Sequence, residues 1–414
     1  MNGIKNNSNF INLLIFLFLF SVFLLPSFHI VEHFPNVRMD DFLLLIILPI
    51  LAYNFKSDKN ISTYLILIFT FLAWISVTIL INIQNNDING IYELYKLIKY
   101  FLVFCFFYKY CLSEDLFRKL INIFFILIIV FNIFQLYNIM NVNFNILKYY
   151  TGEGQIYNTL IIELSKYSYV KRLIGTMGNP NNNAILISFF VIFYFINLSK
   201  FKKFQYFVLF LTSLVFFLLC NSRTTLIALL FSFILYLILI NKNIFKIIID
   251  FFLMLLFLML IQKFEKLDYI NSLFTLSFSE NTSLMKRFEV WDYLFDMIKD
   301  SFIFGYGPYK NFFYSNSLYS ENEYILMLWR YGVPGVILYL LELFIPLHQA
   351  FKNKSNYFSK IVFMFSIVIL ICALTNNPMS EPRINVIYAL ISSLMFSEIK
   401  KNNEVYGNVQ NVTD

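Results

Sequence analysis

Apolar runs about as long as a membrane-crossing helix recur along almost the whole chain. An α-helix needs about 20 residues to cross the hydrocarbon core of a bilayer. Runs of this kind lie near residues 10–30, 42–55, 61–81, 91–111, 116–140, 183–199, 204–221, 222–240, 244–262, 324–349, 358–375 and 384–397. The pattern predicts an all-α fold, a polytopic membrane helix bundle of about 12 transmembrane helices that forms one integral membrane domain over residues 1–414.

The fourth run differs from the others because it contains charged residues. Glu93, Lys96 and Lys99 interrupt its apolar sequence. Charges inside a membrane segment face a protein interior or water rather than lipid tails. We therefore expect this segment to be amphipathic or buried among other helices.

Two long connections, residues 141–182 and 263–323, stand out among short ones and are predicted to form outer loops. The second loop contains a helical pattern near 284–300, since Asn281, Thr282 and Ser283 can cap a helix. Apolar residues then follow at spacings of three and four, which predicts an amphipathic helix on the membrane surface or over a cavity. They are Phe288, Trp291, Phe295 and Ile298.

Composition excludes a soluble globule. Hydrophobic residues make up 59% of the chain, charged residues only 14%, and the mean hydropathy is +0.67. No internal repeat is visible, and a transporter built from two similar halves is therefore disfavoured.

Basic residues are distributed unevenly between the two predicted faces. With a cytoplasmic N-terminus, 16 Lys and Arg fall on the inner side, whereas the short outer loops hold only Arg38, Arg223 and Arg383. By the positive-inside rule both termini are cytoplasmic. The net charge of +7 then reflects topology and attraction to membrane lipid, and no motif for binding nucleic acid is present.

Arginine follows the opposite trend to lysine. Six of the seven arginines lie at the predicted outer ends of the apolar runs, and Arg118 is the exception. Arginine grips phosphate and carboxylate bidentately and stays charged, so this face is predicted to bind anions. The four cysteines lack metal-ligand spacing, and His29 and His33 have no third ligand. We therefore expect no disulfide, no metal site and no cofactor.

Several short motifs resemble the O-antigen polymerase and O-antigen ligase superfamily, over about residues 160 to 340. Arg172-Leu-Ile-Gly-Thr-Met-Gly-Asn-Pro-Asn181 opens one membrane helix and Asn221-Ser-Arg-Thr224 opens another. Arg287-Phe-Glu-Val-Trp291 leads to Gly305-Tyr-Gly307, and Glu321-Asn-Glu-Tyr324 precedes Arg330-Tyr-Gly-Val-Pro-Gly335. Arg38-Met-Asp-Asp41 is also similar to the family pattern.

The resemblance implies a metal-independent glycosyltransferase in the bacterial cytoplasmic (inner) membrane. Such an O-antigen or capsule repeat-unit polymerase moves a glycan from polyprenyl diphosphate onto a lipid-linked repeat unit at the outer face, with inversion at the anomeric carbon, and a chain-length regulator is a possible partner. Two alternatives stay open. One is an O-antigen ligase that transfers glycan to a lipid A core, and the other is a flippase for lipid-linked oligosaccharide.

A diphosphate leaving group needs cationic donors aimed at it, and Arg172, Arg223 and Arg287 are the predicted ones. Possible supporting residues are Arg330, Asn179 and Ser222. Free backbone amides in the turn after Arg172 are also suited to an anion.

Structural alternatives exist for each of these arginines. Arg223 could extend to the interface from a helix end, and Arg172 could pair with Glu163 or Glu153. Arg330 is expected to face the bundle, with Glu323 as its candidate partner. Arg383 is expected to be a loop or interface residue.

The base that activates the acceptor hydroxyl is predicted to be Glu323 or Asp41. Ligases of the superfamily tend to have histidine where this chain has Glu321-Asn-Glu323, and this departure favours a polymerase. A carboxylate among apolar neighbours has a raised pKa, which suits a general base. Asp40 and Asp41 could instead be salt-bridge partners of Arg38.

Overall fold

The computed structural model describes residues 2–28, 37–54, 59–84, 88–151, 172–240, 282–309 and 320–413, together with residues 158, 161, 162, 312 and 316. Within these ranges the chain is almost entirely helical, which confirms the all-α prediction. The exception is a small antiparallel pair of strands, β1 (Ser27–Phe28) and β2 (Val37–Arg38), with Ser27 opposite Arg38.

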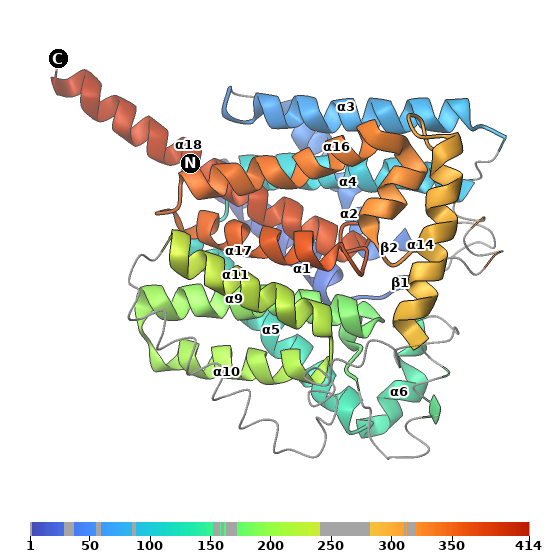
Figure 1. Ribbon diagram of the computed structural model, residues 1–414. Helices are drawn as coiled ribbons and strands as arrows, with labels where there is room; N and C mark the ends of the chain where they lie inside the picture. Colours follow the sequence, from blue (N-terminus) through green and yellow to red (C-terminus); the bar gives the residue numbers. More distant parts are fainter. Residues whose placement is uncertain are drawn as a thin grey trace.

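The helices of the bundle coincide with the predicted apolar runs, apart from the run at 244–262, which lies outside the described residues. They lie roughly parallel or antiparallel to one another in one bundle (Figure 1). In chain order they are α1 (Asn2–Leu24), α2 (Met39–Asn54), α3 (Lys59–Ile81), α4 (Ile88–Lys109), α5 (Glu114–Leu136), α9 (Pro180–Phe201), α10 (Phe204–Leu219), α11 (Arg223–Leu239), α16 (Glu323–Lys352), α17 (Tyr357–Cys372) and α18 (Pro382–Thr413).

Length and hydropathy mark the protein as an integral membrane protein. Among the described helices, four contain a stretch long and apolar enough to cross a bilayer, in α3, α5, α9 and α16, and shorter apolar stretches lie in α1, α10, α11 and α17. Large apolar side chains such as Leu45, Ile66, Leu80 and Phe204 are mostly exposed. Exposed apolar side chains in these numbers suit contact with lipid tails.

The centre of the bundle is formed by α9, α17 and α18. Helix α17 contacts α9, α11, α16 and α18, and side chains such as Phe189, Val191, Phe365 and Leu390 are fully buried. Helix α4 packs against α18, α2 and α3, and Glu93 and Lys99 in it are buried. The charged fourth run is therefore a helix buried among others, one of the two arrangements expected for it.

Helix α14 (Thr282–Asp300) lies where the sequence predicts a helix in the second outer loop. It crosses one end of the bundle, nearly at right angles to the other helices (Figure 1). Within the predicted apolar stripe, Phe288 and Phe295 are 53% and 44% exposed. The packed face instead has Leu294 and Ile298, which contact Ile325, Leu326 and Trp329 of α16.

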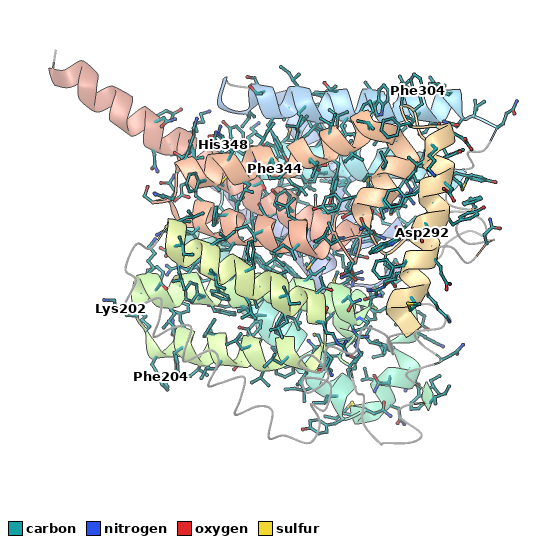
Figure 2. All side chains as sticks on the ribbon, viewed as in Figure 1. Lys202, Phe204, Asp292, Phe304, Phe344 and His348 are labelled. Atoms are coloured by element: carbon teal, nitrogen blue, oxygen red, sulfur yellow. The ribbon has the colours of Figure 1, made fainter. Side chains whose placement is uncertain are left out.

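Four shorter helices belong to the first long connection: η1 (Ile139–Asn141), α6 (Val142–Asn145), α7 (Lys148–Thr151) and η2 (Gly175–Met177). They lie at the same end of the bundle as α14 (Figure 1). The beginning of α1 and the end of α18 lie at the opposite end. The two ends are marked in Figure 2 by Asp292 on α14 and by Lys202 after α9.

Candidate functional site

Charged side chains gather inside the α14 end of the bundle, where α2, α4, α9, α11, α16 and α18 begin (Figure 1). We call this the outer end, because it carries the segments that the sequence predicts to be outer loops. A buried charge is costly unless it is paired or hydrogen-bonded, so the partners of each residue decide what it can do. The buried charged residues at this end are Arg38, Asp40, Glu93, Lys99, Glu323, Arg330 and Arg383.

Asp40 and Asp41 at the start of α2 are neutralised by two cations. Arg38 Nε lies 2.9 Å from Asp40 Oδ1, and Lys99 forms ion pairs with both carboxylates, at 2.5 Å from Asp41 Oδ1. Asp41 also accepts hydrogen bonds from Tyr95 Oη at 2.8 Å and from the backbone N–H of Arg38 at 2.7 Å. Asp41, a predicted base, is therefore held in an ion-pair cluster.

Arg172 lies between two turns of the outer end. Its guanidinium donates to Asn181 Oδ1 at 2.9 Å and to the backbone carbonyl of Cys220 at 3.4 Å. The next residue, Leu173, donates its backbone N–H to the carbonyl of Leu219 at 3.1 Å. These contacts attach Arg172 to the α10–α11 turn, which carries Ser222 and Arg223.

The turn after Arg172 does not offer the free amides that the sequence suggests. Gln135 Oε1 accepts the backbone N–H groups of Ile174 and Gly175 at 3.0 and 2.9 Å. Asn179 is the N-cap of α9, and its Oδ1 accepts from Asn181 at 2.8 Å and Asn182 at 3.3 Å. Side chains of the protein thus accept these backbone amides, which were predicted to be free to bind an anion. Asn179 has a structural role as a helix cap.

Gly178 is required by the close packing of this turn. Its φ is +69°, and a Cβ atom there would lie 2.1 Å from the carbonyl oxygen of Tyr150. Only glycine adopts this conformation without strain in that space, so the shape of this turn depends on glycine at position 178.

Arg223 is the first residue of α11 and is partly buried. The preceding Ser222 is the N-cap, and its Oγ lies 2.9 Å from Thr225 Oγ1. Thr375 Oγ1 donates to Thr224 Oγ1 at 2.7 Å, which ties this turn to the end of α17. Arg172 and Arg223 therefore come from adjoining turns of the outer end.

Arg287 lies on α14 rather than on a helix of the bundle. It forms an ion pair with Glu321, the residue two positions before α16. The side chains of Arg287 and Glu321 are 23% and 44% exposed. This pair is thus accessible from outside the bundle, unlike the buried Glu323 and Arg330.

Glu323 has the opposite environment. It is fully buried, and its two carboxylate oxygens accept four hydrogen bonds. The donors are Tyr339 Oη at 2.9 Å, the Met379 amide at 3.0 Å, and the Ser380 amide and hydroxyl at 2.6 and 2.8 Å. Glu323 therefore joins the start of α16 to the turn between α17 and α18.

Arg330 faces the bundle as expected, but the expected pairing with Glu323 is wrong. Its Nη1 lies 3.7 Å from Glu93 Oε2, and Lys96 Nζ lies 3.1 Å from Glu93 Oε1. The sequence separation of seven suggested a contact along one helix. The buried α4 provides a carboxylate instead, while Glu323 is occupied by the α17–α18 turn.

Two glycine-containing motifs that are far apart in sequence meet at this point. The backbone N–H of Tyr306 donates to the carbonyl of Trp329 at 2.9 Å. The backbone N–H of Gly307 donates to the carbonyl of Arg330 at 2.8 Å. Gly332 has a φ of +63° and kinks α16, so that residues 302–307 can pack against the kink. The Gly305–Gly307 motif and the Arg330–Gly335 motif therefore pack together as one structural unit next to α14.

Arg383 is not a loop or interface residue, contrary to the prediction. It is the second residue of α18 and is only 5% exposed. Its Nη2 donates to the carbonyl of Leu25 at 2.9 Å, and its guanidinium lies over the Tyr150 ring. The proline-rich sequence before it suggested a loop, but those residues form a tight turn that inserts Arg383 between α1 and α7.

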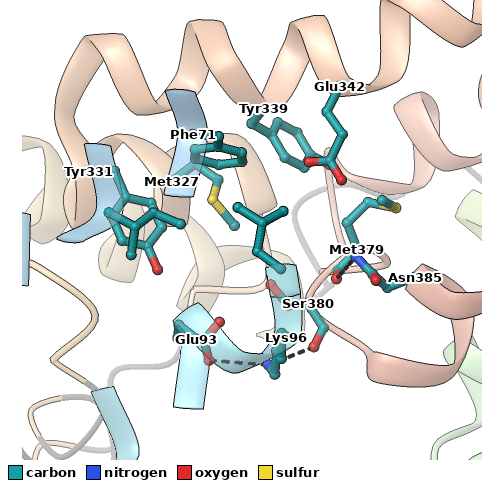
Figure 3. Close-up of a pocket in the computed structure, with 12 residues that line it drawn as sticks. Phe71, Glu93, Lys96, Met327, Tyr331, Tyr339, Glu342, Met379, Ser380 and Asn385 are labelled. Atoms are coloured by element: carbon teal, nitrogen blue, oxygen red, sulfur yellow. Dashed lines mark hydrogen bonds and ion pairs between the residues drawn. The ribbon is translucent and has the colours of Figure 1, made fainter. Parts of the chain in front are cut away.

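A cavity of about 50 Å³ lies below these clusters. Lys96, Glu93 and Ser380 are on one side of it, and Tyr339 and Glu342 are on the other (Figure 3). Lys96 Nζ bridges Glu93 and the carbonyl of Ser380, at 3.1 and 2.9 Å. This volume holds about one or two water molecules, so a sugar does not fit there in this conformation.

The structure brings part of the predicted site together. Arg172, Arg223 and Ser222 are joined through adjoining turns, and Arg287 is placed across the outer end on α14. None of the three predicted diphosphate-binding arginines lines the small cavity. Among the described residues, no group of three His, Cys, Asp or Glu side chains could hold a metal ion.

Part of the chain is similar to a known family of membrane proteins. A family model described as O-antigen ligase matches residues 208–340, and this match confirms the resemblance to the O-antigen polymerase and ligase superfamily. The matched region contains Ser222, Arg223, Arg287, Glu323 and Arg330. A comparison with curated proteins finds no match.

Sequence reasoning overlooked one buried carboxylate. Glu342 lies in the middle of α16 and lines the cavity, and its Oε1 accepts no hydrogen bond from the described residues. A single carboxylate inside an apolar run was the available signal. The same rule correctly drew attention to Glu93, Lys96 and Lys99.

Proposed function

We propose that this protein is an O-antigen or capsule repeat-unit polymerase. It transfers a glycan from polyprenyl diphosphate onto a lipid-linked repeat unit, at the outer face of the bacterial cytoplasmic membrane. The observation that carries the proposal is the placement of Arg172 against the turn that begins with Ser222 and Arg223. The family match over residues 208–340 supports the same class of reaction.

The reaction exchanges one bond at the anomeric carbon. The acceptor hydroxyl oxygen bonds to C1 of the donor glycan as the bond from C1 to the diphosphate oxygen breaks. Negative charge grows on the leaving diphosphate, and fixed guanidinium donors stabilise charge that develops in a transition state. We assign this role to Arg172 and Arg223, with Arg287 contributing from α14.

The acceptor proton requires a carboxylate that the substrate can reach. Glu323 is fully buried with all its hydrogen bonds made, and Asp41 is paired with Lys99. Glu321 is 44% exposed and paired with Arg287. We assign proton acceptance to Glu321 and treat Glu323 as a positioning residue.

The acceptor sugar is expected to bind between α14 and the outer end of the bundle. The cavity below is too small for it, whereas Arg287 and Glu321 are accessible there. Because α14 is attached through the apolar contacts of Leu294 and Ile298, its first turns can hold a substrate without opening the bundle.

The test uses the purified full-length protein in vesicles with polyprenyl-diphosphate-linked repeat units. A polymerase makes lipid-linked glycans of several repeat units. Unchanged glycan length together with movement of the substrate across the bilayer would indicate a flippase. Transfer that occurs only when a lipid A core is added would indicate a ligase.

A second assay tests the assignment of the base. Glu321→Gln is expected to lower the rate about 100-fold or more, since general-base catalysis contributes roughly this factor. Glu289→Gln is the matched control, because Glu289 is an exposed glutamate on α14. Full activity of Glu321→Gln would contradict the assignment.

A further inference from the structure

A second polar pocket lies at the end of the bundle opposite the outer end. The ends of α9 and α11 and the turn between α16 and α17 enclose about 250 Å³. In Figure 2 this is the end marked by Lys202. The pocket is five times as large as the cavity at the outer end, and it is distinct from the residues of the proposed transfer site.

Two lysines line this pocket. Lys200 Nζ donates to both carboxylate oxygens of Glu114, at 2.8 and 2.7 Å. Lys360 is half-buried, and within the described part of the chain it makes no ion pair. Glu398 is the other nearby carboxylate, but its oxygens accept the amides of Tyr357 and Phe358 at 3.1 and 3.0 Å. One ammonium group therefore faces the pocket without a direct counterion.

Hydroxyl groups complete the lining. Tyr236 is 5% exposed, and its hydroxyl donates to no other described residue. Ser199 and Ser355 also line the pocket. An ammonium group with several hydroxyl donors matches the oxygens of a phosphate.

The position of the pocket suggests where the phosphate comes from. Helices α9, α11 and α17 end or begin here, and the ends of membrane-crossing helices are expected at the level of the lipid headgroups. Basic pockets between membrane helices bind the headgroups of anionic lipids. We propose that Lys360, Lys200 and Tyr236 bind the phosphate of an anionic phospholipid from the leaflet at this end.

Native mass spectrometry of the delipidated full-length protein tests the proposal. Phosphatidylglycerol is expected to bind in preference to phosphatidylcholine. Lys360→Ala weakens binding of phosphatidylglycerol about fivefold, and Lys360→Arg keeps most of it. The control is Lys203→Ala, which removes an exposed lysine at the same end that does not line the pocket.

The outcomes distinguish a specific lipid-binding site from nonspecific electrostatic attraction between the protein and anionic lipid. Equal weakening by Lys360→Ala and Lys203→Ala, or equal binding of the two lipids, would overturn the proposal. Inorganic phosphate that binds as tightly as the lipid would show that the ligand is a free anion, and the lipid assignment would be wrong. If Lys360→Ala does not fold, Tyr236→Phe removes a single hydroxyl and is expected to weaken lipid binding about twofold to fivefold; unchanged binding there would contradict the site.

Discussion

Two glutamates at the start of α16 have different environments although they are two residues apart. Glu321 is accessible and paired with Arg287, whereas Glu323 accepts four hydrogen bonds inside the protein. A carboxylate with all its acceptor positions occupied holds structure together rather than taking a proton from a substrate. Burial and partners, not proximity in sequence, thus separate the two roles.

The four hydrogen bonds accepted by Glu323 lead to a prediction for Glu323→Gln. The glutamine amide nitrogen would face the Ser380 or Met379 amides, so at least one accepted hydrogen bond is lost and a donor meets a donor. The expected cost is roughly 3 kcal/mol of unfolding free energy, seen as a lower melting temperature in detergent. Glu321→Gln should melt like the unchanged protein; a Glu323→Gln variant that is fully stable and inactive would point to direct catalysis instead.

At the scale of elements, the kink in α16 determines where Arg330 and residues 302–307 lie. Gly332 has a φ of +63°, and a Cβ atom there would lie 1.9 Å from the carbonyl oxygen of Ile303. The kink lets residues 302–307 pair with the backbone of Trp329 and Arg330. The position of α14 therefore depends on a glycine in a membrane helix.

Gly332→Ala is expected to destabilise the protein by about 2 kcal/mol or more, because the new methyl group meets backbone in a conformation that favours glycine. Ile337→Ala is the control, since Ile337 lies five residues further along α16 and is half exposed. The measurement is thermal unfolding followed by intrinsic fluorescence. Equal melting temperatures for the two variants would show that the kink tolerates a side chain.

The helices were predictable from sequence, whereas the contacts between them were not. Runs of apolar residues locate α3, α5, α9 and α16 because the bilayer sets their length. The pairing of Arg330 with Glu93, and the insertion of Arg383 between α1 and α7, depend on how distant segments pack. On α14 likewise, the sequence did not show that Leu294 packs against α16 while Phe295 of the apolar stripe is exposed.

Considered as a whole, the molecule has two chemically different ends. Arginine and buried carboxylates lie at the outer end, and exposed lysines such as Lys202 and Lys203 lie at the other. Attraction of lysine to the cytoplasmic side sets the orientation of such proteins. We expect the α14 end to face away from the cytoplasm.

Labelling of introduced cysteines tests this orientation. Asp292→Cys on α14 should react with a membrane-impermeant thiol reagent in intact cells, whereas Lys202→Cys should react only after the membrane is permeabilised. Both positions are exposed and lie at opposite ends (Figure 2). The unsubstituted protein controls for background, since Cys105, Cys220 and Cys372 are buried but Cys111 is partly exposed. Labelling of Lys202→Cys in intact cells would contradict the proposed orientation.

The central claim is that guanidinium groups at the outer end hold the diphosphate while the glycan is transferred. Its most direct test is the polymerisation rate of Arg172→Lys, Arg223→Lys and Arg287→Lys in vesicles, with Arg118→Lys at the opposite end as the control. Lysine keeps the charge but loses the bidentate contact. Arg172→Lys and Arg223→Lys should therefore be at least about tenfold slower, while the Arg118→Lys control retains the full rate. Full-length glycan at the unchanged rate from all three variants would contradict the account.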